Sequence, residues 1–91
     1  MRLRWTPTAA NDLEHISDYL LQHHPSFAQP TVRHIYDQIL TLRQSPRRGR
    51  IGREPGTREL VLTDLPYIVV FRVSDQAVEI LHIFHGAQDW Q

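Results

Sequence analysis

The amino-acid sequence predicts an α+β domain in which a hairpin of two helices packs on one face of an antiparallel sheet. Two observations indicate this class. Between residues 7 and 45 apolar side chains recur at helical spacing, whereas from residue 57 onward they alternate with polar ones or run together in short stretches bounded by turns. The chain has 91 residues, of which 41% are hydrophobic, so residues 1–91 are expected to fold as one domain around a single core.

A short strand and a first helix are expected at the start of the chain. Residues 2–5 alternate as a strand does. Thr6 can then cap a helix with its hydroxyl, and Pro7 suits the first helical position, where a missing N–H costs nothing. Pro25 is expected to end this helix. The apolar stripe of the helix consists of Ala9, Leu13, Ile16 and Leu20.

A second helix is predicted up to about Ser45, where the sequence QSP stops it. The sequence contains two competing signals for the first residue of this helix. Ser26 with Gln29 resembles a capping box, whereas Pro30 would fit the first turn. The apolar stripe of this helix consists of Ala28, Val32, Ile35, Ile39 and Leu42.

Three strands are predicted in the second half of the chain. TRELVL and VEILHIFH alternate, and YIVVFRV between them is an apolar run, which is typical of a central strand buried on both faces. The stretches TDLP and SDQA separate the three strands at hairpin distances. The three strands therefore form an antiparallel meander to which the N-terminal strand is added, with the helical hairpin on one face.

Composition excludes several classes of site. Without cysteine the chain has neither a disulfide framework nor a thiolate metal site. No apolar run approaches the roughly 20 residues that span a bilayer, and the N-terminus lacks the apolar region of a signal peptide. A cytoplasmic protein without a membrane partner is therefore expected, and we expect no metal and no other cofactor.

Histidines are the usual carriers of acid–base chemistry, and the chain has six. His82 and His85 are three residues apart on one strand and should point to opposite faces unless a bulge intervenes. They therefore do not form the pair of rings that a two-histidine ribonuclease needs around one phosphate, and they lack a third zinc ligand. The other four are assigned to a helix end or to polar helical positions: His23, His24, His15 and His34.

The stretch from Arg43 to Arg58 carries six arginines and one acid, Glu54, in a chain whose formal net charge is zero. Three interpretations stay open: a solvated loop, a phosphate or nucleic-acid site, and a surface that captures an acidic peptide or protein. Trp90, near the C-terminus, is interpreted first as part of the core and otherwise as an exposed contact for a partner. The candidate partner-binding residues are Arg47, Arg48, Arg50, Arg53, Arg58 and Trp90.

Five motifs in this chain resemble the RelE/ParE superfamily of bacterial type II toxins. They are W-x-P-x-A-x-x-D-L at residues 5–13, SPRRGR, TRELVL, PYIVVFRV and ILHIFHGAQDW, and together they cover nearly the whole chain. The resemblance implies the fold predicted above and a toxin held inactive by a co-expressed antitoxin, whose flexible and often acidic C-terminal segment folds across the toxin. Toxin and antitoxin would then form a hetero-oligomer, and the arginine-rich stretch would have an acidic partner.

The superfamily divides by target. RelE-like members cut mRNA on the ribosome without a metal ion, and ParE-like members block DNA gyrase. The cleaving members carry an arginine in the central strand, at the position of Ile68, and an arginine or histidine after the last strand, near Gln88. Because Ile68 cannot stabilise a pentavalent phosphate, the resemblance favours gyrase inhibition over RNA cleavage. A non-toxic regulatory binding module is a third possibility.

Four residues would still serve an RNase, with Arg58 and Arg72 as cations and with Glu54 and His85 as acid–base partners. Each has a structural alternative. Glu54 can be a loop charge, and His85 can cap the strand end. Arg72 can pair with an acid on a neighbouring strand, either Glu59 or Glu79. For each of these residues the structural alternative is preferred, so none is assigned to catalysis. We expect a protein that inhibits its target by binding it.

Overall fold

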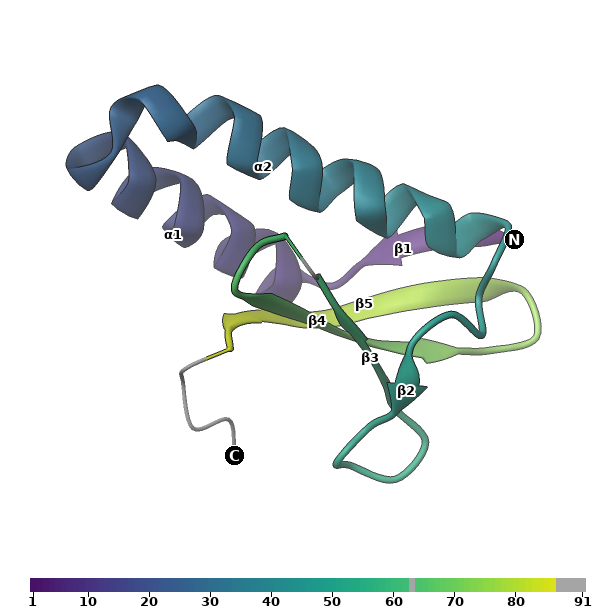
Figure 1. The fold of residues 1–91 in the computed structure, drawn as a ribbon. Coiled ribbons are helices and arrows are strands. Elements are labelled where there is room, and N and C mark those ends of the chain that lie inside the picture. The colour runs from purple at the N-terminus through teal and green to yellow at the C-terminus, as the bar shows by residue number, and fades with distance from the viewer. Residues whose placement is uncertain (63, 87–91) are drawn as a thin grey trace.

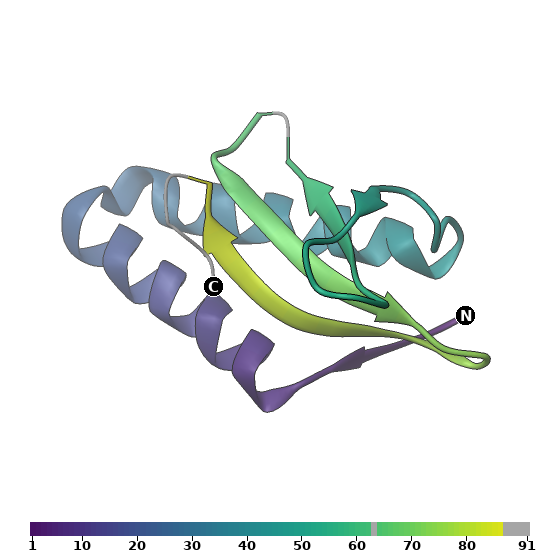
Figure 2. The same ribbon diagram turned by 90° about the horizontal axis from the view of Figure 1, so that it is seen from below.

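The computed structural model describes residues 1–62 and 64–86. Two helices lie side by side over one face of a five-stranded sheet, and no described helix covers the other face (Figures 1 and 2). The elements are β1 (Arg2–Trp5), α1 (Pro7–His23), α2 (Pro25–Leu40), the 3-10 turn η1 (Thr41–Arg43), β2 (Arg50–Ile51), β3 (Arg58–Val61), β4 (Tyr67–Val73) and β5 (Ala77–His85). The predicted α+β class, with a helical hairpin between an N-terminal strand and a three-stranded meander, is confirmed.

The sheet is mixed, which corrects the prediction of a purely antiparallel sheet. Its strand order is β1-β5-β4-β3-β2, and β1 pairs with β5 in parallel, from Arg2 opposite Ala77 to Trp5 opposite Ile80. The three C-terminal strands are antiparallel to one another, as predicted. The parallel pairing is possible because β1 and β5 are joined through two helices and three other strands rather than by a hairpin.

The start of α1 is confirmed and also ties the helix to the sheet. The Thr6 hydroxyl accepts a hydrogen bond from the Ala9 amide at 3.1 Å and donates one to the Ile80 carbonyl at 2.7 Å, while Pro7 occupies the first turn. The same threonine therefore caps α1 and fixes its entry point against β5. His23 and His24 lie at the C-terminal end of the helix, as expected.

The second helix begins earlier than either sequence signal indicated. Pro25 is at its first turn, so Ser26 and Gln29 are not a capping box at its start, and Pro30 lies inside the helix. Only His24, with φ −146° and ψ 62°, separates the two helices. Pro25 ends α1, as predicted, and its fixed φ also suits the first position of α2. Pro30 leaves the carbonyl of Ser26 without its helical hydrogen bond, and Ser26 is exposed, so this carbonyl can bond to water.

The core lies between the helices and the sheet. Val69, Val70 and Phe71 of β4 are at most 1% exposed, which confirms β4 as the central strand. Phe71 pairs with Ile80 and Val70 with His82, so Leu81 of β5 is a bulged residue. The bulge reverses the alternation of β5 and lets both Ile80 and Ile83 join the core. The buried cluster comprises Ala9, Ile35, Ile39, Leu42, Leu60, Leu62, Tyr67, Val69, Phe71, Val78, Ile80 and Ile83.

Within the described residues, no helix is both long enough and apolar enough to cross a membrane.

Candidate functional site

Residues 43–58, the arginine segment, form a folded structure rather than a loose loop. Residues Arg50–Ile51 pair with β3 as an additional strand, β2, which the sequence did not predict. The turn between β2 and β3 is closed by a hydrogen bond from the Gly52 amide to the Thr57 carbonyl at 2.8 Å. Gly49 approaches β3 so closely that a Cβ would lie 2.6 Å from the Glu59 carbonyl oxygen, and its φ of +107° suits glycine. The backbone of the segment is therefore anchored to β3, while Arg47, Arg48, Arg50 and Arg53 stay exposed, and the three interpretations of the segment remain predictions.

Glu59 organises the arginine segment from the adjoining strand. This carboxylate is only 5% exposed. Its Oε1 accepts from the Arg50 guanidinium at 2.8 and 3.0 Å, and its Oε2 accepts from the Arg53 amide at 3.2 Å. Burial acts to raise the pKa of Glu59, but the hydrogen bonds from Arg50 and Arg53 and their positive charges outweigh it, so the pKa lies below its usual value. Glu59 is therefore ionised at neutral pH and holds β2 and the following turn on β3.

Arg58 holds the same segment from the other face of β3. Its guanidinium donates to the carbonyls of Arg47 and Gly49 at 3.0 and 3.3 Å. The Arg58 Nε is buried without a hydrogen-bond partner among the described residues. Because successive strand residues point to opposite faces, Arg58 and Glu59 hold the segment from its two sides. Arg58 is thus placed as a positioning residue for the segment.

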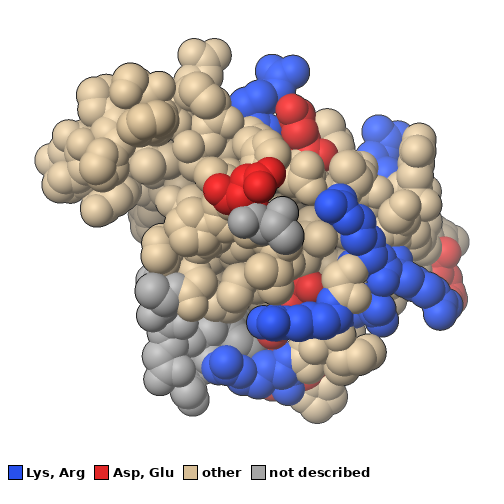
Figure 3. Space-filling view, viewed as in Figure 1, with Lys and Arg blue, Asp and Glu red and all other residues tan. Residues whose placement is uncertain are grey.

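The exposed cations of the arginine segment gather on one side of the molecule. Arg47, Arg48, Arg50 and Arg53 are all exposed, and Figure 3 shows positively charged side chains over the half of this view that carries β2 and β3. Arg48 is also tied to the end of α2, since its guanidinium donates to the side chains of Gln38 and Thr41. Trp90, the sixth candidate partner-binding residue, lies outside the described residues, as does Gln88.

Next to this surface, three apolar side chains form a row on the face of the sheet opposite the helices. Ile68 pairs with Val61 of β3 on one side and with Phe84 of β5 on the other. Val61 is 42% exposed, and the other two are half-buried. Their neighbour Val69 is in the core, so Ile68 points the opposite way. Ile68, where the resemblance implies an arginine in RNA-cleaving members, is therefore an apolar side chain on the face of the sheet that no described helix covers.

The four residues that would serve an RNase do not converge. Arg72 pairs with Glu79, with hydrogen bonds of 2.7 and 3.1 Å, as the sequence allowed. The hydrogen bond from Arg72 is the main cause that lowers the pKa of Glu79. His85 pairs with Tyr67 at the opposite end of β4, about 17 Å from Arg72 at the rise of a strand. Arg58 is engaged with the arginine segment, and Glu54 is exposed in the turn after β2.

His82 makes a contact that sequence reasoning missed. Its Nδ1 lies 2.7 Å from Asp12 Oδ2 of α1, which also accepts from the Ile83 amide at 2.9 Å. Asp12 thereby accepts a hydrogen bond from a backbone amide of β5 that lies beyond the residues paired with β1. From His82 to His85, β5 pairs with β4 without a bulge. The two histidine rings therefore point to opposite faces of the sheet, as predicted. No group of three or more histidine, aspartate or glutamate side chains in the described ranges is arranged to hold a metal ion.

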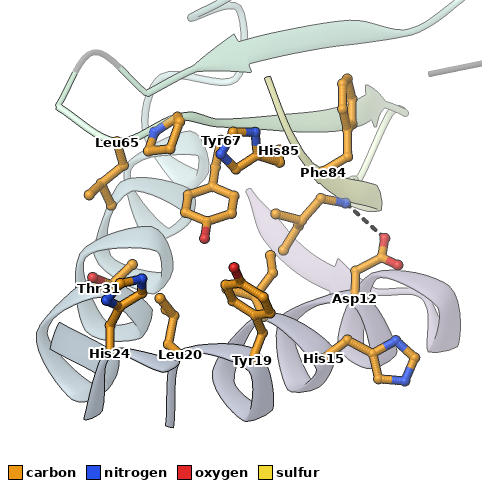
Figure 4. Close-up of a pocket in the computed structure, with 13 residues that line it drawn as sticks. Asp12, His15, Tyr19, Leu20, His24, Thr31, Leu65, Tyr67, Phe84 and His85 are labelled. Atoms are coloured by element: carbon orange, nitrogen blue, oxygen red, sulfur yellow. Dashed lines mark hydrogen bonds between the residues drawn. The ribbon is translucent and has the colours of Figure 1, made fainter. Parts of the chain in front are cut away.

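A cleft of about 660 Å³ opens between the helical hairpin and the ends of β4 and β5 (Figure 4). Its floor is apolar, with Ile16, Leu20 and Ile83 among the lining residues. The hydroxyls of Tyr19 and Tyr67 point toward one another across it. Burial raises the pKa of the Tyr67 hydroxyl, and the nearby Tyr19 adds to the shift. No local sequence pattern indicates this cleft, because its walls come from segments far apart in the chain.

Comparisons with known proteins agree on one family. The family described as the ParE toxin of the type II toxin–antitoxin system parDE matches residues 3–90. The Y4kP protein of Sinorhizobium fredii is 42% identical over 89 residues, covering 98% of this chain and 92% of its own length. Toxin RelE2 of Caulobacter vibrioides is 36% identical over 84 residues, covering 92% and 93%.

Two solved structures extend the likeness to three dimensions. The chromosomal ParDE toxin–antitoxin system from P. aeruginosa contains a chain that is 35% identical with a TM-score of 0.87, over 93% of this chain and 95% of that one. The toxin–antitoxin complex RelBE2 from Mycobacterium tuberculosis contains a chain that is 26% identical with a TM-score of 0.59, over 92% and 95%.

Replacing the organising carboxylate should destabilise the protein in a pH-dependent way. We expect Glu59→Gln to lower the free energy of unfolding by about 1–3 kcal/mol at pH 7, because Arg50 and the Arg53 amide lose a charged acceptor. The pKa of Glu59 is lowered in the folded state, so its contribution is fully present above the ordinary value of 4.5 and is lost as the pH falls through the folded pKa. Urea unfolding between pH 3 and 8 measures this.

The matched control for this variant is Glu54→Gln, which removes an exposed acid from the same segment. It should leave the unfolding curve within about 0.5 kcal/mol of wild type at every pH. Equal effects of the two substitutions, or a Glu59→Gln difference that does not shrink in acid, would show that Glu59 does not organise the segment.

Proposed function

The chain belongs to the ParE family of toxins of type II toxin–antitoxin systems, and we propose that it inhibits growth by binding DNA gyrase, without cleaving RNA. The single observation that carries this proposal is the dispersal of the groups that RNA cleavage would need. Arg72 is paired with Glu79, and Arg58 donates hydrogen bonds to backbone carbonyls. His85 pairs with Tyr67, at the end of β4 far from Arg72.

Metal-independent cleavage of RNA requires cations at the phosphate and an acid and a base within hydrogen-bond reach of the reacting oxygens. In this chain Ile68 replaces the central-strand arginine that the cleaving relatives carry. It lies in an apolar row with Val61 and Phe84, a surface suited to contact with a protein. The greater likeness to the ParDE chain than to the RelBE2 chain also supports the gyrase target.

We further propose that an acidic antitoxin neutralises this toxin through the arginine segment. Of the two solved relatives, one belongs to a toxin–antitoxin system and the other is a toxin–antitoxin complex. The arginine segment presents exposed cations on a backbone that Glu59 and Arg58 fix in place, so little ordering of the toxin is needed when an acidic chain binds. Burial of the adjoining apolar row would supply affinity, and the arginines would steer and orient the partner.

Ribosome-dependent RNA cleavage is the second candidate function. It is favoured by the likeness to Toxin RelE2 of Caulobacter vibrioides, which is 36% identical. In that case Arg58, Arg72, Glu54 and His85 would have to move together in the presence of the ribosome. A non-toxic regulatory module, the third possibility, would bind the antitoxin without affecting growth.

A two-part assay separates these functions. Purified toxin should stop DNA supercoiling by gyrase, and the same preparation added to translating ribosomes should leave mRNA intact. Ile68→Arg should not create cleavage, because catalytic groups act as a unit. In cells, expression alone should cause filamentation with a DNA-damage response, and co-expression of the antitoxin should restore growth.

Cleavage of mRNA in the ribosomal A site by the wild-type chain would refute the gyrase proposal and assign Arg58, Arg72, His85 and Glu54 to catalysis. Harmless expression of the chain alone would instead support the regulatory module.

Charge removal from the arginine segment should weaken antitoxin binding without unfolding the toxin. For the double variant Arg47→Gln with Arg53→Gln, we expect slower association and a flatter dependence of affinity on salt, because the lost attraction is long-range and is screened over roughly 10 Å at 0.1 M salt. Its thermal midpoint should stay within a few degrees of wild type. Stopped-flow association at several salt concentrations measures the effect.

Arg50→Gln serves as the contrasting variant, since it removes one charge and also the partner of Glu59. It should lower both the thermal midpoint and the affinity. A double variant that associates at the wild-type rate at every salt concentration would show that the arginines do not steer the antitoxin.

A further inference from the structure

The outer edge of β2 carries main-chain hydrogen-bonding groups that the sheet does not use. β2 is the last strand in the sheet order, and no described strand lies beyond it (Figure 1). The Gly52 amide donates to the Thr57 carbonyl at 2.8 Å, so these two residues form a hydrogen-bonded pair of the antiparallel ladder. Hydrogen-bonded and non-hydrogen-bonded pairs alternate along such a ladder. Arg50 therefore bonds to β3, and the N–H and C=O of Ile51 point away from the sheet.

The Ile51 side chain is exposed beside these main-chain groups. At 76% it is the most exposed of the large apolar side chains in the described part of the chain. A strand edge with unpaired main-chain groups is a template to which a further strand can add, and apolar side chains give such a pairing affinity. The side chains of Glu59 and Arg58 already hold the backbone of this edge on β3. An added strand therefore requires little ordering of the toxin.

The charge around this edge restricts which strand can add to it. The arginine segment has six arginines and one acid, and Arg47, Arg50 and Arg53 are exposed on either side of Ile51 in the chain. A second copy of this chain would bring the same positive charge against the edge, and like charges on neighbouring strands repel. An acidic strand is attracted by the same arginines. The edge is therefore protected against pairing with itself and suited to an acidic partner.

We propose that the antitoxin binds by strand addition, with an extended acidic segment pairing along the outer edge of β2 and bonding to the N–H and C=O of Ile51. Side chains alternate along a strand, so an apolar side chain of the segment packs on Ile51, and the acids before and after it lie on the face of Arg50. The inference rests on the proposed neutralisation through the arginine segment. It adds the mode of binding and the pattern of the bound segment, which is an apolar residue between acids.

Hydrogen exchange at one amide tests strand addition in the unmodified toxin. The partner is the full-length antitoxin that restores growth when it is co-expressed. In the free toxin the Ile51 amide should exchange close to the rate of an unstructured peptide, whereas the Gly52 amide, which is bonded to β3, should be protected. In the complex the Ile51 amide should exchange at least about tenfold more slowly, because it then donates to the added strand.

An Ile51 amide that exchanges equally fast in the free toxin and in a stable complex would refute strand addition and leave the proposed neutralisation in place. Failure of the wild-type toxin to bind any antitoxin would refute both.

Exchange in the antitoxin identifies the added segment. The antitoxin amides that become protected in the complex should include a run in which an apolar residue stands between acids. Protection confined to segments without acids would overturn the proposed pairing.

Ile51→Pro removes the N–H that the added strand requires. The pairing of β2 with β3 should persist, because this N–H points away from β3 and proline is tolerated at such positions of edge strands. The variant should dissociate from the antitoxin at least about tenfold faster than wild type, because a main-chain hydrogen bond is lost. The matched control, Ile51→Val, keeps both the N–H and a branched apolar side chain, and its dissociation rate should stay within about twofold of wild type.

Protection of the Gly52 amide shows whether the proline variant keeps β2 on β3. Wild-type dissociation of a proline variant that retains this protection would contradict strand addition. If the variant loses this protection, the exchange of the Ile51 amide in the wild-type complex decides between the two outcomes.

Discussion

The arrangement of the candidate partner surface depends on one buried carboxylate. Glu59 is 5% exposed, and a charge in such a position is tolerated only when it is paired and hydrogen-bonded. Its partners are the guanidinium of Arg50 and the backbone amide of Arg53, both from the arginine segment. Because Glu59 is buried, it needs these partners, and the need places the arginine segment beside β3. Six arginines close together would otherwise repel one another and favour an extended loop.

Several of these arginines have structural roles. Arg58 binds the carbonyls of Arg47 and Gly49, Arg50 neutralises Glu59, and Arg48 bonds to the end of α2. These contacts fix the backbone, while the side chains of Arg47, Arg48, Arg50 and Arg53 are exposed. A fixed array of cations loses less conformational entropy on binding than a mobile one, which suits the proposed binding of an acidic antitoxin. The positive charge of this chain is thus concentrated in a segment whose backbone is fixed by hydrogen bonds to β3.

Local signals predicted much of the fold. Thr6 and Pro7 marked the start of α1, the apolar run of β4 marked the central strand, and the alternation from His82 to His85, past the bulge, placed these two side chains on opposite faces. These features depend on residues close together in the chain. The likeness to a toxin family was also visible in sequence motifs, and the family is confirmed.

Features that depend on distant contacts could not be predicted in the same way. The parallel pairing of β1 with β5 joins residues more than 70 positions apart, and the pairing of β2 depends on Glu59 rather than on any strand pattern in RRGRIGR. Asp12 reaches β5 from α1, and Tyr19 meets Tyr67 across the cleft, although nothing in their local sequence relates them. Pro30 misled because it lies inside α2, whereas the sequence signals placed it in the first turn of the helix.

Amide hydrogen exchange across residues 47–57 tests most directly whether the arginine segment is a folded contact surface. The hydrogen bonds of the Gly52, Arg53 and Thr57 amides should slow their exchange in the free toxin, and binding of the antitoxin should slow it further. Exchange at the rate of an unstructured peptide in the free toxin, unchanged in the complex, would contradict the account.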